Sequence, residues 1–479
     1  MRSHEAGVLH AEGYGGPPLY LPTPTDVMEL LPQLWARTVT RDDHGRLTVG
    51  GVDVVTLAAE HGTAAYVLDE ADFRSRAAEF RDSFFSAFDD LAGADVYYAG
   101  KAFLCTAVAR WVDEEGLFLD VCTGGELAVA QRARFPGARI GFHGNNKTVA
   151  EIREALTYGV GRIVVDSFQE IDRIALVAAD LGVVAPVMVR VTVGVEAHTH
   201  EFIATGHEDQ KFGFSLAGGR AFEAASRILA RPDVFALRGL HSHIGSQIFD
   251  TGGFETAAHR LVALHARIAD EHGHHCPEID LGGGYGIAYT SQHTPLPAST
   301  LAREMAGILE RELKGVGDGD LRRLPRVSVE PGRAIVGPST FTLYEVGTVK
   351  PVEVGGGHTR TYVSVDGGMS DNARPALYEA DYSCTLANRR STAGPLLSRV
   401  VGRHCESGDI VVLDEYLPAD VRPGDLIAVP GTGAYCRSLS SQYNHTPRPP
   451  VVAVRGGRSR VLVRRETIDD LLALDVADA

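Results

Sequence analysis

Residues 94–101, ADVYYAGK, form a short apolar run that ends in a glycine and a lysine. Similar runs recur along the chain as far as Val329, and each is followed by a longer stretch with apolar residues three and four positions apart. This alternation is typical of parallel strands joined by crossover helices. Residues 148–158 and 253–272 are two of the expected helices.

Eight strands are expected in this part of the chain: residues 95–99, 117–121, 139–142, 162–165, 187–191, 237–242, 278–281 and 326–329. Eight parallel βα units close naturally into a (β/α)8 TIM-type barrel, whose active site lies at the C-terminal ends of the strands. An open, doubly wound sheet gives the same local pattern and is the alternative fold.

After Arg333 the pattern changes to β-branched runs punctuated by Gly and Pro, which predicts a second, mostly β domain. Its expected strands are residues 362–365, 409–413, 425–429 and 451–454, with an early strand from residues 50–57. The predicted organisation is a disordered extension over 1–30, a segment of the β domain over 31–64, the barrel over 65–333 and the C-terminal β domain over 334–479.

The composition excludes several classes of function. The net charge of -16 disfavours binding to nucleic acid or to anionic lipid. No apolar run is long enough to span a membrane, and the N-terminus lacks the apolar core of a secretion signal, so a cytoplasmic enzyme is expected. Six cysteines without CxxC spacing indicate neither a zinc site nor disulfides. The stretch HGHHC at 272–276 is interpreted as a solvated turn, and no metal is expected.

Unusual residues follow the predicted strands. Lys101 comes just after the first strand, where partial desolvation would free its amine to form a Schiff base, although most lysines near strand ends are solvated or ion-paired. His243 and Ser246 follow the sixth strand.

A glycine triplet, Gly282, Gly283 and Gly284, follows the seventh strand, where this fold usually binds phosphate; a tight turn is the alternative. Glu330, Gly332 and Arg333 follow the eighth. An amine, an imidazole, a phosphate cradle and a carboxylate together match the needs of pyridoxal phosphate.

The second domain has its own candidates. Cys405 lies between His404 and Glu406, and could be a reactive acid or a small buried apolar residue. Arg374 and Tyr378 have the spacing of neighbours on one helical turn, and the arginine could clamp a carboxylate or form a surface ion pair.

Nine stretches, taken in order, carry a family resemblance: YYAGKAF, DVCTGGE, HGNNK, HSHIGSQ, DLGGGYG, EPGR, DGGMSDNARPALY, HCESGD and GAYCRSLSSQYN. From about Leu31 to the C-terminus the sequence resembles the diaminopimelate decarboxylase family and, more loosely, the barrel-type decarboxylases that act on ornithine and arginine. Two small departures are Gly100, where Ala or Val is common, and Tyr285, where an aliphatic residue is usual.

The resemblance implies pyridoxal 5'-phosphate as cofactor. Lys101 would be the Schiff-base lysine, and the remaining implied cofactor-binding residues are Asp120, His243 stacked on the ring, Ser246 and Gly282 to Gly284 on the phosphate, Glu330 at the pyridine nitrogen, Gly332, Arg333 and Tyr435. The implied substrate-binding residues are Arg333, Arg374, Tyr378, Glu406 and Tyr435.

The implied reaction is decarboxylation of meso-2,6-diaminopimelate to L-lysine in a homodimer with shared active sites, where Cys405 and Glu406 enter from the partner subunit and Cys405 returns the proton. Two alternatives remain open. One is a decarboxylase for another amino acid, such as ornithine, arginine or a carrier-bound substrate. The other is a catalytically silent regulatory homologue, which the presence of Lys101 and Cys405 disfavours.

Overall fold

The computed structural model describes residues 18, 20–194, 211–314, 324–353 and 359–477. The chain divides into two compact units. The barrel unit comprises residues 74–286 and 295–334, and the β unit comprises residues 1–73, 287–294 and 335–479. Most of the predicted N-terminal extension, residues 1–17 and 19, lies outside the described residues.

The barrel unit is a closed ring of eight parallel strands. In order around the ring these are β5 (Ala94–Ala99), β6 (Phe118–Val121), β7 (Ile140–Phe142), β8 (Arg162–Val165), β9 (Ala185–Thr192), β11 (Phe235–His241), β12 (Glu278–Asp280) and β13 (Arg326–Val329). Because β8 pairs with β9 and β13 pairs with β5, no edge is left open. The predicted (β/α)8 barrel is confirmed, and the open doubly wound sheet is excluded. The short strand β10 (Phe214–Ser215) pairs with β9 outside the ring.

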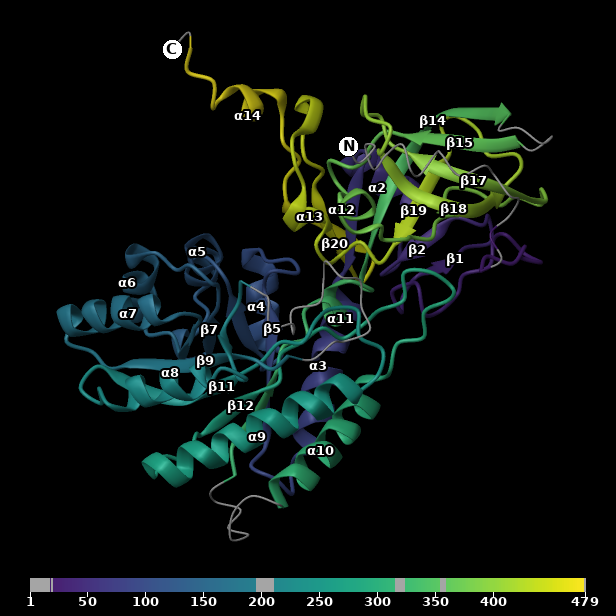
Figure 1. Ribbon diagram of the computed structural model, residues 1–479. Coiled ribbons are helices and arrows are strands. Elements are labelled where there is room, and N and C mark those ends of the chain that lie inside the picture. The colour runs from purple at the N-terminus through teal and green to yellow at the C-terminus, as the bar shows by residue number, and fades with distance from the viewer. Residues whose placement is uncertain (1–17, 19, 195–210, 315–323, 354–358, 478–479) are drawn as a thin grey trace. The chain divides into compact units, whose positions relative to one another are not determined.

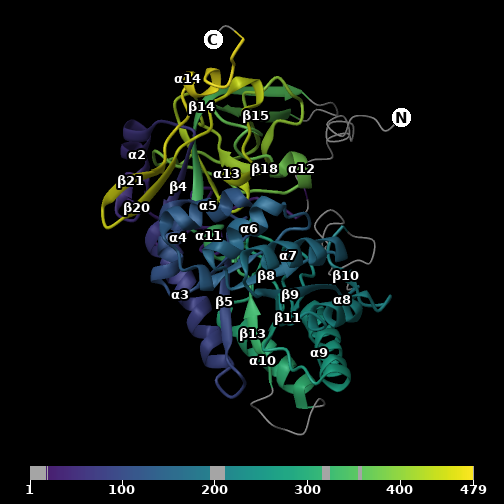
Figure 2. The ribbon, with the colours of Figure 1, turned by 90° about the vertical axis from the view of Figure 1, so that its left-hand side faces the viewer.

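Helices surround the strands of this unit (Figures 1 and 2). They are α3 (Glu70–Ala87), which begins before the unit, α4 (Thr106–Glu114), α5 (Gly124–Ala133), α6 (Val149–Tyr158), α7 (Phe168–Leu181), α8 (Arg220–Leu229), α9 (Gly252–His272) and α10 (Ala298–Lys314).

Helix α6 illustrates how local sequence sets these bounds. Thr148 and Glu151 form a reciprocal capping box at its start, and Gly159 adopts the left-handed conformation that ends it. Between them Ile152, Ala155 and Leu156 are buried, at the spacing of one helical face. The predicted helices at 148–158 and 253–272 are both confirmed.

The β unit contains a large sheet and a small one. The large sheet has the order β18 (Ile410–Pro418), β17 (Pro395–Val401), β15 (Thr359–Val365), β14 (Thr340–Glu353), β4 (Ala65–Asp69), β20 (Val451–Arg455) and β21 (Arg458–Val463). Strand β19 (Leu426–Pro430) pairs with β14 and with β16 (Thr385–Leu386), while β1 (Thr40–Arg41), β2 (Leu47–Val49) and β3 (Val52–Asp53) form the small sheet. The predicted second, mostly β domain is confirmed. Its short helices are α2 (Val54–His61), α12 (Arg374–Tyr378), α13 (Cys436–Leu439) and α14 (Ile468–Leu472).

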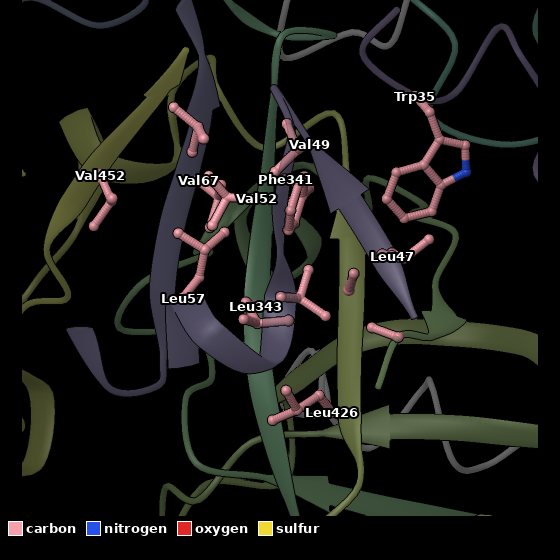
Figure 3. Packing of buried hydrophobic residues seen from close by; sticks show 14 of the residues in the cluster. Trp35, Leu47, Val49, Val52, Leu57, Val67, Phe341, Leu343, Leu426 and Val452 are labelled. Carbon is pink, nitrogen blue, oxygen red and sulfur yellow. The ribbon is translucent and has the colours of Figure 1, made fainter. Parts of the chain in front are cut away.

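The core of the β unit joins distant parts of the sequence (Figure 3). Trp35 meets Phe341 edge-on, with ring centroids 6.0 Å apart, and Val67, Leu343 and Val452 are buried in the same cluster. Because early, middle and late segments bury apolar surface together, none of them has a complete core by itself.

Two predicted boundaries in the N-terminal region are wrong. The strand predicted over residues 50–57 is limited to Val52–Asp53 (β3), because Gly50 and Gly51 have positive φ angles in a turn and Asp53 caps helix α2 by accepting from the amides of Val55 and Thr56. Residues 65–69 belong to the β unit as strand β4 rather than to the barrel. Their buried run followed by a helix has the same local pattern as a barrel βα unit.

Among the described helices, none combines the length and the apolar character needed to cross a bilayer.

Candidate active site

The predicted site residues of the barrel unit lie at the C-terminal ends of its strands. Lys101 follows β5 and is exposed, Asp120 lies on β6, and Glu330 follows β13 directly. Burial raises the pKa of both carboxyls, and the Lys101 ammonium partly opposes this rise. An amine and two buried acids therefore influence one another at this rim, as the sequence predicts for the fold.

The loops after β11, β12 and β13 approach one another too closely for side chains at two of the predicted glycines. A Cβ at Gly283 would lie 2.2 Å from the carbonyl oxygen of Glu330, and one at Gly284, where φ is +103°, would lie 2.3 Å from that of Gly245. Substitution at either position would force the loops apart.

The amides of two glycines in the triplet are already engaged within the protein. Gly282 donates to Oδ1 of Asp280 over 2.7 Å, and Gly283 donates to Nδ1 of His243 over 3.2 Å. The Gly283 bond helps to hold the imidazole of His243, and burial lowers the pKa of this imidazole well below its usual value. The amides of these two glycines thus help to fix the shape of the loop.

Arg333 and Ser246 contact each other at the same rim. Nη2 of Arg333 donates to Oγ of Ser246 over 2.6 Å, and the Arg333 residue is buried. Gly332 permits this loop to approach β5, since a Cβ there would lie 2.8 Å from the carbonyl oxygen of Ala99. The structure therefore joins a predicted phosphate ligand to a predicted substrate ligand.

Two histidines that the sequence analysis left unassigned surround Glu330. Nε2 of His241, the last residue of β11, lies 3.0 Å from Oε1 of Glu330. Nε2 of His143, which follows β7, lies 3.5 Å from the same oxygen and 2.9 Å from Oδ1 of Asp120. All four residues are buried. Their position after the strands is visible in the sequence, because they begin the stretches HGNNK and HSHIGS, but their contact with Glu330 is not.

This cluster also has the spacing of a metal site. Within the described ranges, donor atoms of His143, His241 and Glu330 all lie within 4.8 Å of one another. Nε2 of each histidine already lies within hydrogen-bonding distance of a carboxylate oxygen, and the charges of Arg162 and Arg190 counter the attraction of Glu330 and Asp280 for a further cation. We therefore interpret the cluster as a hydrogen-bonded carboxylate site. The HGHHC stretch forms a turn between α9 and β12, where Nε2 of His274 lies 3.1 Å from the carbonyl oxygen of Leu237.

In the β unit, Arg374 begins α12 and is buried. Its Nη1 donates to the hydroxyl of Tyr382 over 2.6 Å, and its guanidinium lies over the ring of Tyr289, 4.6 Å from the centroid. Tyr378 ends the same helix, so the predicted one-turn spacing is confirmed. The alternative of a surface ion pair is excluded by the burial of Arg374.

Cys405 is exposed, which excludes the alternative of a small buried apolar residue. Its backbone amide donates to Oδ1 of Asn444 over 3.3 Å. The neighbouring His404 is buried, with its ring nitrogens 2.8 Å from Oγ of Ser370 and 3.2 Å from Oδ1 of Asn444. These bonds hold the loop that presents the thiol, with Glu406 half-buried beside it.

Tyr435 adopts a left-handed backbone conformation with φ of 66°. This conformation is uncommon for a residue with a Cβ, and such strain is often found at functional sites. All six cysteines are free.

Comparisons with known proteins show the family of this chain. Residues 72–337 match the family described as pyridoxal-dependent decarboxylase, pyridoxal binding domain. The diaminopimelate decarboxylase of Mycobacterium tuberculosis is 54% identical over 94% of this chain and 99% of its own, and that of Bacillus subtilis is 44% identical over 92% and 97%. The chain belongs to the diaminopimelate decarboxylase family.

A solved structure of this family leads to the same conclusion. The diaminopimelate decarboxylase of M. jannaschii, crystallised with L-lysine, superposes with a TM-score of 0.85 at 30% identity, covering 92% of this chain and 98% of its own.

The cofactor of this decarboxylase is pyridoxal 5'-phosphate, and the observed geometry fits it. Gly283 and Gly284 let the loops after β11, β12 and β13 approach one another closely at the strand ends, and the carboxylate of Glu330 is held by His241. Lys101 supplies an exposed amine at the same strand ends.

Proposed function

We propose that this decarboxylase converts meso-2,6-diaminopimelate to L-lysine and carbon dioxide, the last step of lysine biosynthesis. The observation that carries the proposal is the full-length similarity to enzymes named for this substrate, including those of M. tuberculosis and B. subtilis. Bound pyridoxal phosphate supplies a ring that accepts the electron pair released when the carboxylate leaves.

The barrel residues hold and orient this cofactor. Lys101 would provide the amine for covalent attachment, with Asp120 near it, and Glu330 would hold the pyridine nitrogen. His243 would cover the ring, and its imidazole is kept in place by the amide of Gly283. Ser246 and Gly284 would hold the phosphate, while Gly282, Gly283 and Gly332 set the shape of the loops.

The substrate requires groups of both charges, because its distal end carries a carboxylate and an ammonium. Arg333 and Arg374 bind carboxylate, and a buried arginine held by a tyrosine hydroxyl, as Arg374 is, provides a preorganised clamp. Tyr378 and Tyr435 line the substrate, and Glu406 binds the distal ammonium.

Cys405 returns a proton to the carbon that has lost its carboxylate. Its exposed thiol lies on a loop held by Asn444. An exposed thiol on an ordered loop suits a group that acts on a substrate bound by another subunit. We propose that Cys405 and Glu406 act in the site of a second copy of the chain, so that the enzyme is a homodimer with shared active sites. A cytoplasmic location fits a biosynthetic step of this kind.

The substrate assignment is tested by comparing kcat/KM for meso-diaminopimelate, ornithine, arginine and lysine with one preparation of the enzyme loaded with cofactor. The proposal predicts that diaminopimelate is preferred by orders of magnitude, because the other three lack the distal zwitterion. A preference for ornithine or arginine would overturn it, and the absence of turnover on all four would favour the silent regulatory homologue.

A further inference from the structure

We propose that His143 and His241 are positioning residues for Glu330: His241 donates its Nε2–H to the Glu330 carboxylate, and His143 holds its Nε2–H, bonded to Asp120, beside the same carboxylate, so that Glu330 stays ionised against the pyridine nitrogen of the cofactor. The inference rests on the proposed role of Glu330 and deepens it.

Geometry defines the direction of these hydrogen bonds. Nε2 of His241 lies 3.0 Å and Nε2 of His143 lies 3.5 Å from the same atom, Oε1 of Glu330. An ionised carboxylate only accepts hydrogen bonds, so a nitrogen that bonds to it must carry the proton. Both imidazoles would therefore be Nε2–H tautomers.

The other ring nitrogen of His241 supports this assignment. Its Nδ1 is buried and has no hydrogen-bond partner among the residues that the structure describes. A buried N–H without a partner costs more than a bare nitrogen in an apolar setting, because the donor loses its bond to water. The proton is thus better placed on Nε2, where Glu330 accepts it.

Both imidazoles are uncharged at neutral pH. Burial lowers the pKa of His143 to about 4 and that of His241 well below its usual value, with contributions from the positive charges of Arg162 and Arg190. Neutral donors favour the ionised form of Glu330 without competing with the cofactor as a counter-charge.

Asp120 completes the arrangement from the other side. Its Oδ1 lies 2.9 Å from Nε2 of His143, so this N–H is hydrogen-bonded to Asp120 while Nε2 lies 3.5 Å from Oε1 of Glu330. Burial and the Asp120 charge both raise the pKa of Glu330. Without the histidine donors the buried Glu330 would take up a proton more readily, and the ring nitrogen would then lose its anionic partner.

Matched substitutions distinguish loss of the N–H donor from a change in side-chain volume. His143→Gln and His241→Gln keep an N–H near the position of Nε2, whereas His143→Leu and His241→Leu remove it. His265→Leu is the control, because His265 is also a buried histidine of the barrel unit but lies on α9. Each enzyme is loaded with cofactor labelled with ¹⁵N in the ring, and the ¹⁵N chemical shift reports whether that nitrogen is protonated.

The Leu variants should move the ring ¹⁵N shift towards the unprotonated value and weaken cofactor binding by about 10- to 100-fold, the worth of a hydrogen bond to a charged group. The Gln variants should have a ring ¹⁵N shift and a cofactor affinity close to those of the wild type. His265→Leu should change neither quantity.

The Glu330→Gln variant tests the proposed role of Glu330 separately from the role of the two histidines. If Glu330→Gln leaves the ¹⁵N shift unchanged, the proposed role of Glu330 fails. If Glu330→Gln moves the shift and the Leu variants do not, the inference fails while that role stands.

A second readout covers variants that do not fold. In the cofactor-free wild-type protein, ¹³C and ¹⁵N spectra of labelled histidine assign the tautomers directly. Nε2–H at His143 and His241 is the expected result, and Nδ1–H at either residue would overturn the inference.

Discussion

Arg162 on β8 and Asp280 on β12 form an ion pair inside the barrel, with side-chain exposures of 2% and 0%. Arg162 also bonds to Glu278 and to Ser328, and its guanidinium lies over the ring of Tyr97, 3.6 Å from the centroid. A single cation thus ties strands from different parts of the ring beneath the candidate site.

Arg162→Met should lower the free energy of unfolding by about 3–5 kcal/mol, because it leaves buried carboxylates without their counter-charge. Denaturant unfolding followed by circular dichroism measures the loss. Arg153→Met is the matched control, since Arg153 and Asp180 form an exposed pair. Its effect should stay below about 1 kcal/mol. Equal effects of the two variants would contradict a structural role for the buried pair.

Arg374→Ala should raise KM for diaminopimelate by about 10- to 100-fold while leaving cofactor affinity unchanged, because a charged clamp of about 1.5–3 kcal/mol is lost. Tyr382→Phe should have a smaller effect in the same direction, since it removes only the hydroxyl that Arg374 contacts. Steady-state kinetics and cofactor titration separate the two quantities. A matching loss of cofactor affinity would show that Arg374 is not a substrate ligand.

His265 should contribute to acid sensitivity. Burial, together with His275 and His274, lowers its pKa from 6.5 to about 4. Between these values the unfolded chain binds a proton that the folded chain does not, so stability falls as the pH drops through this window. The contribution is about 1.4 kcal/mol per pH unit at most. The difference in unfolding free energy between wild type and His265→Leu, measured at steps from pH 7 to pH 4, should shrink accordingly. A constant difference would contradict the assigned pKa.

Cys405→Ala should slow turnover by about 10²–10⁴-fold without loss of cofactor, the usual worth of a positioned acid. Mixing it with Lys101→Ala should recover up to about a quarter of wild-type activity. Random exchange makes about half of the dimers heterodimers, and one of the two sites in each heterodimer is intact. Mixing Lys101→Ala with Glu330→Gln is the control and should recover nothing, since both residues belong to the same barrel. No recovery in the first mixture, with subunit exchange confirmed by mass, would exclude shared sites.

The barrel was predictable from the sequence because each strand is a short apolar run with a helix after it, and the pattern repeats. Every predicted barrel strand is found within two residues of its observed ends. Strand β4 could not be separated from this series, because Ala65–Asp69 is buried and followed by α3 as a barrel strand would be. Only its pairing with β14 and β20, distant in sequence, assigns it to the β unit.

The site residues that could be predicted are those whose residue type is unusual at their position. Lys101 directly after a strand is one example, and the three successive glycines 282–284 are another. His143 and His241 were not assigned, since a histidine at a strand end gives no local sign of its partner. Their approach to Glu330 depends on β7, β11 and β13 closing into one ring. The burial of Arg374 and the exposure of Cys405 were equally undetermined, because each depends on packing within the β unit.

The stoichiometry of the products shows whether this enzyme decarboxylates diaminopimelate to lysine. Enzyme loaded with pyridoxal phosphate is incubated with meso-diaminopimelate, and L-lysine and carbon dioxide are quantified together over time. We predict that they form in a one-to-one ratio with wild type, and that Lys101→Ala forms neither. The proposed reaction would be contradicted by carbon dioxide without lysine or by no reaction of the loaded wild-type enzyme. The role of Lys101 would be contradicted by undiminished turnover of Lys101→Ala.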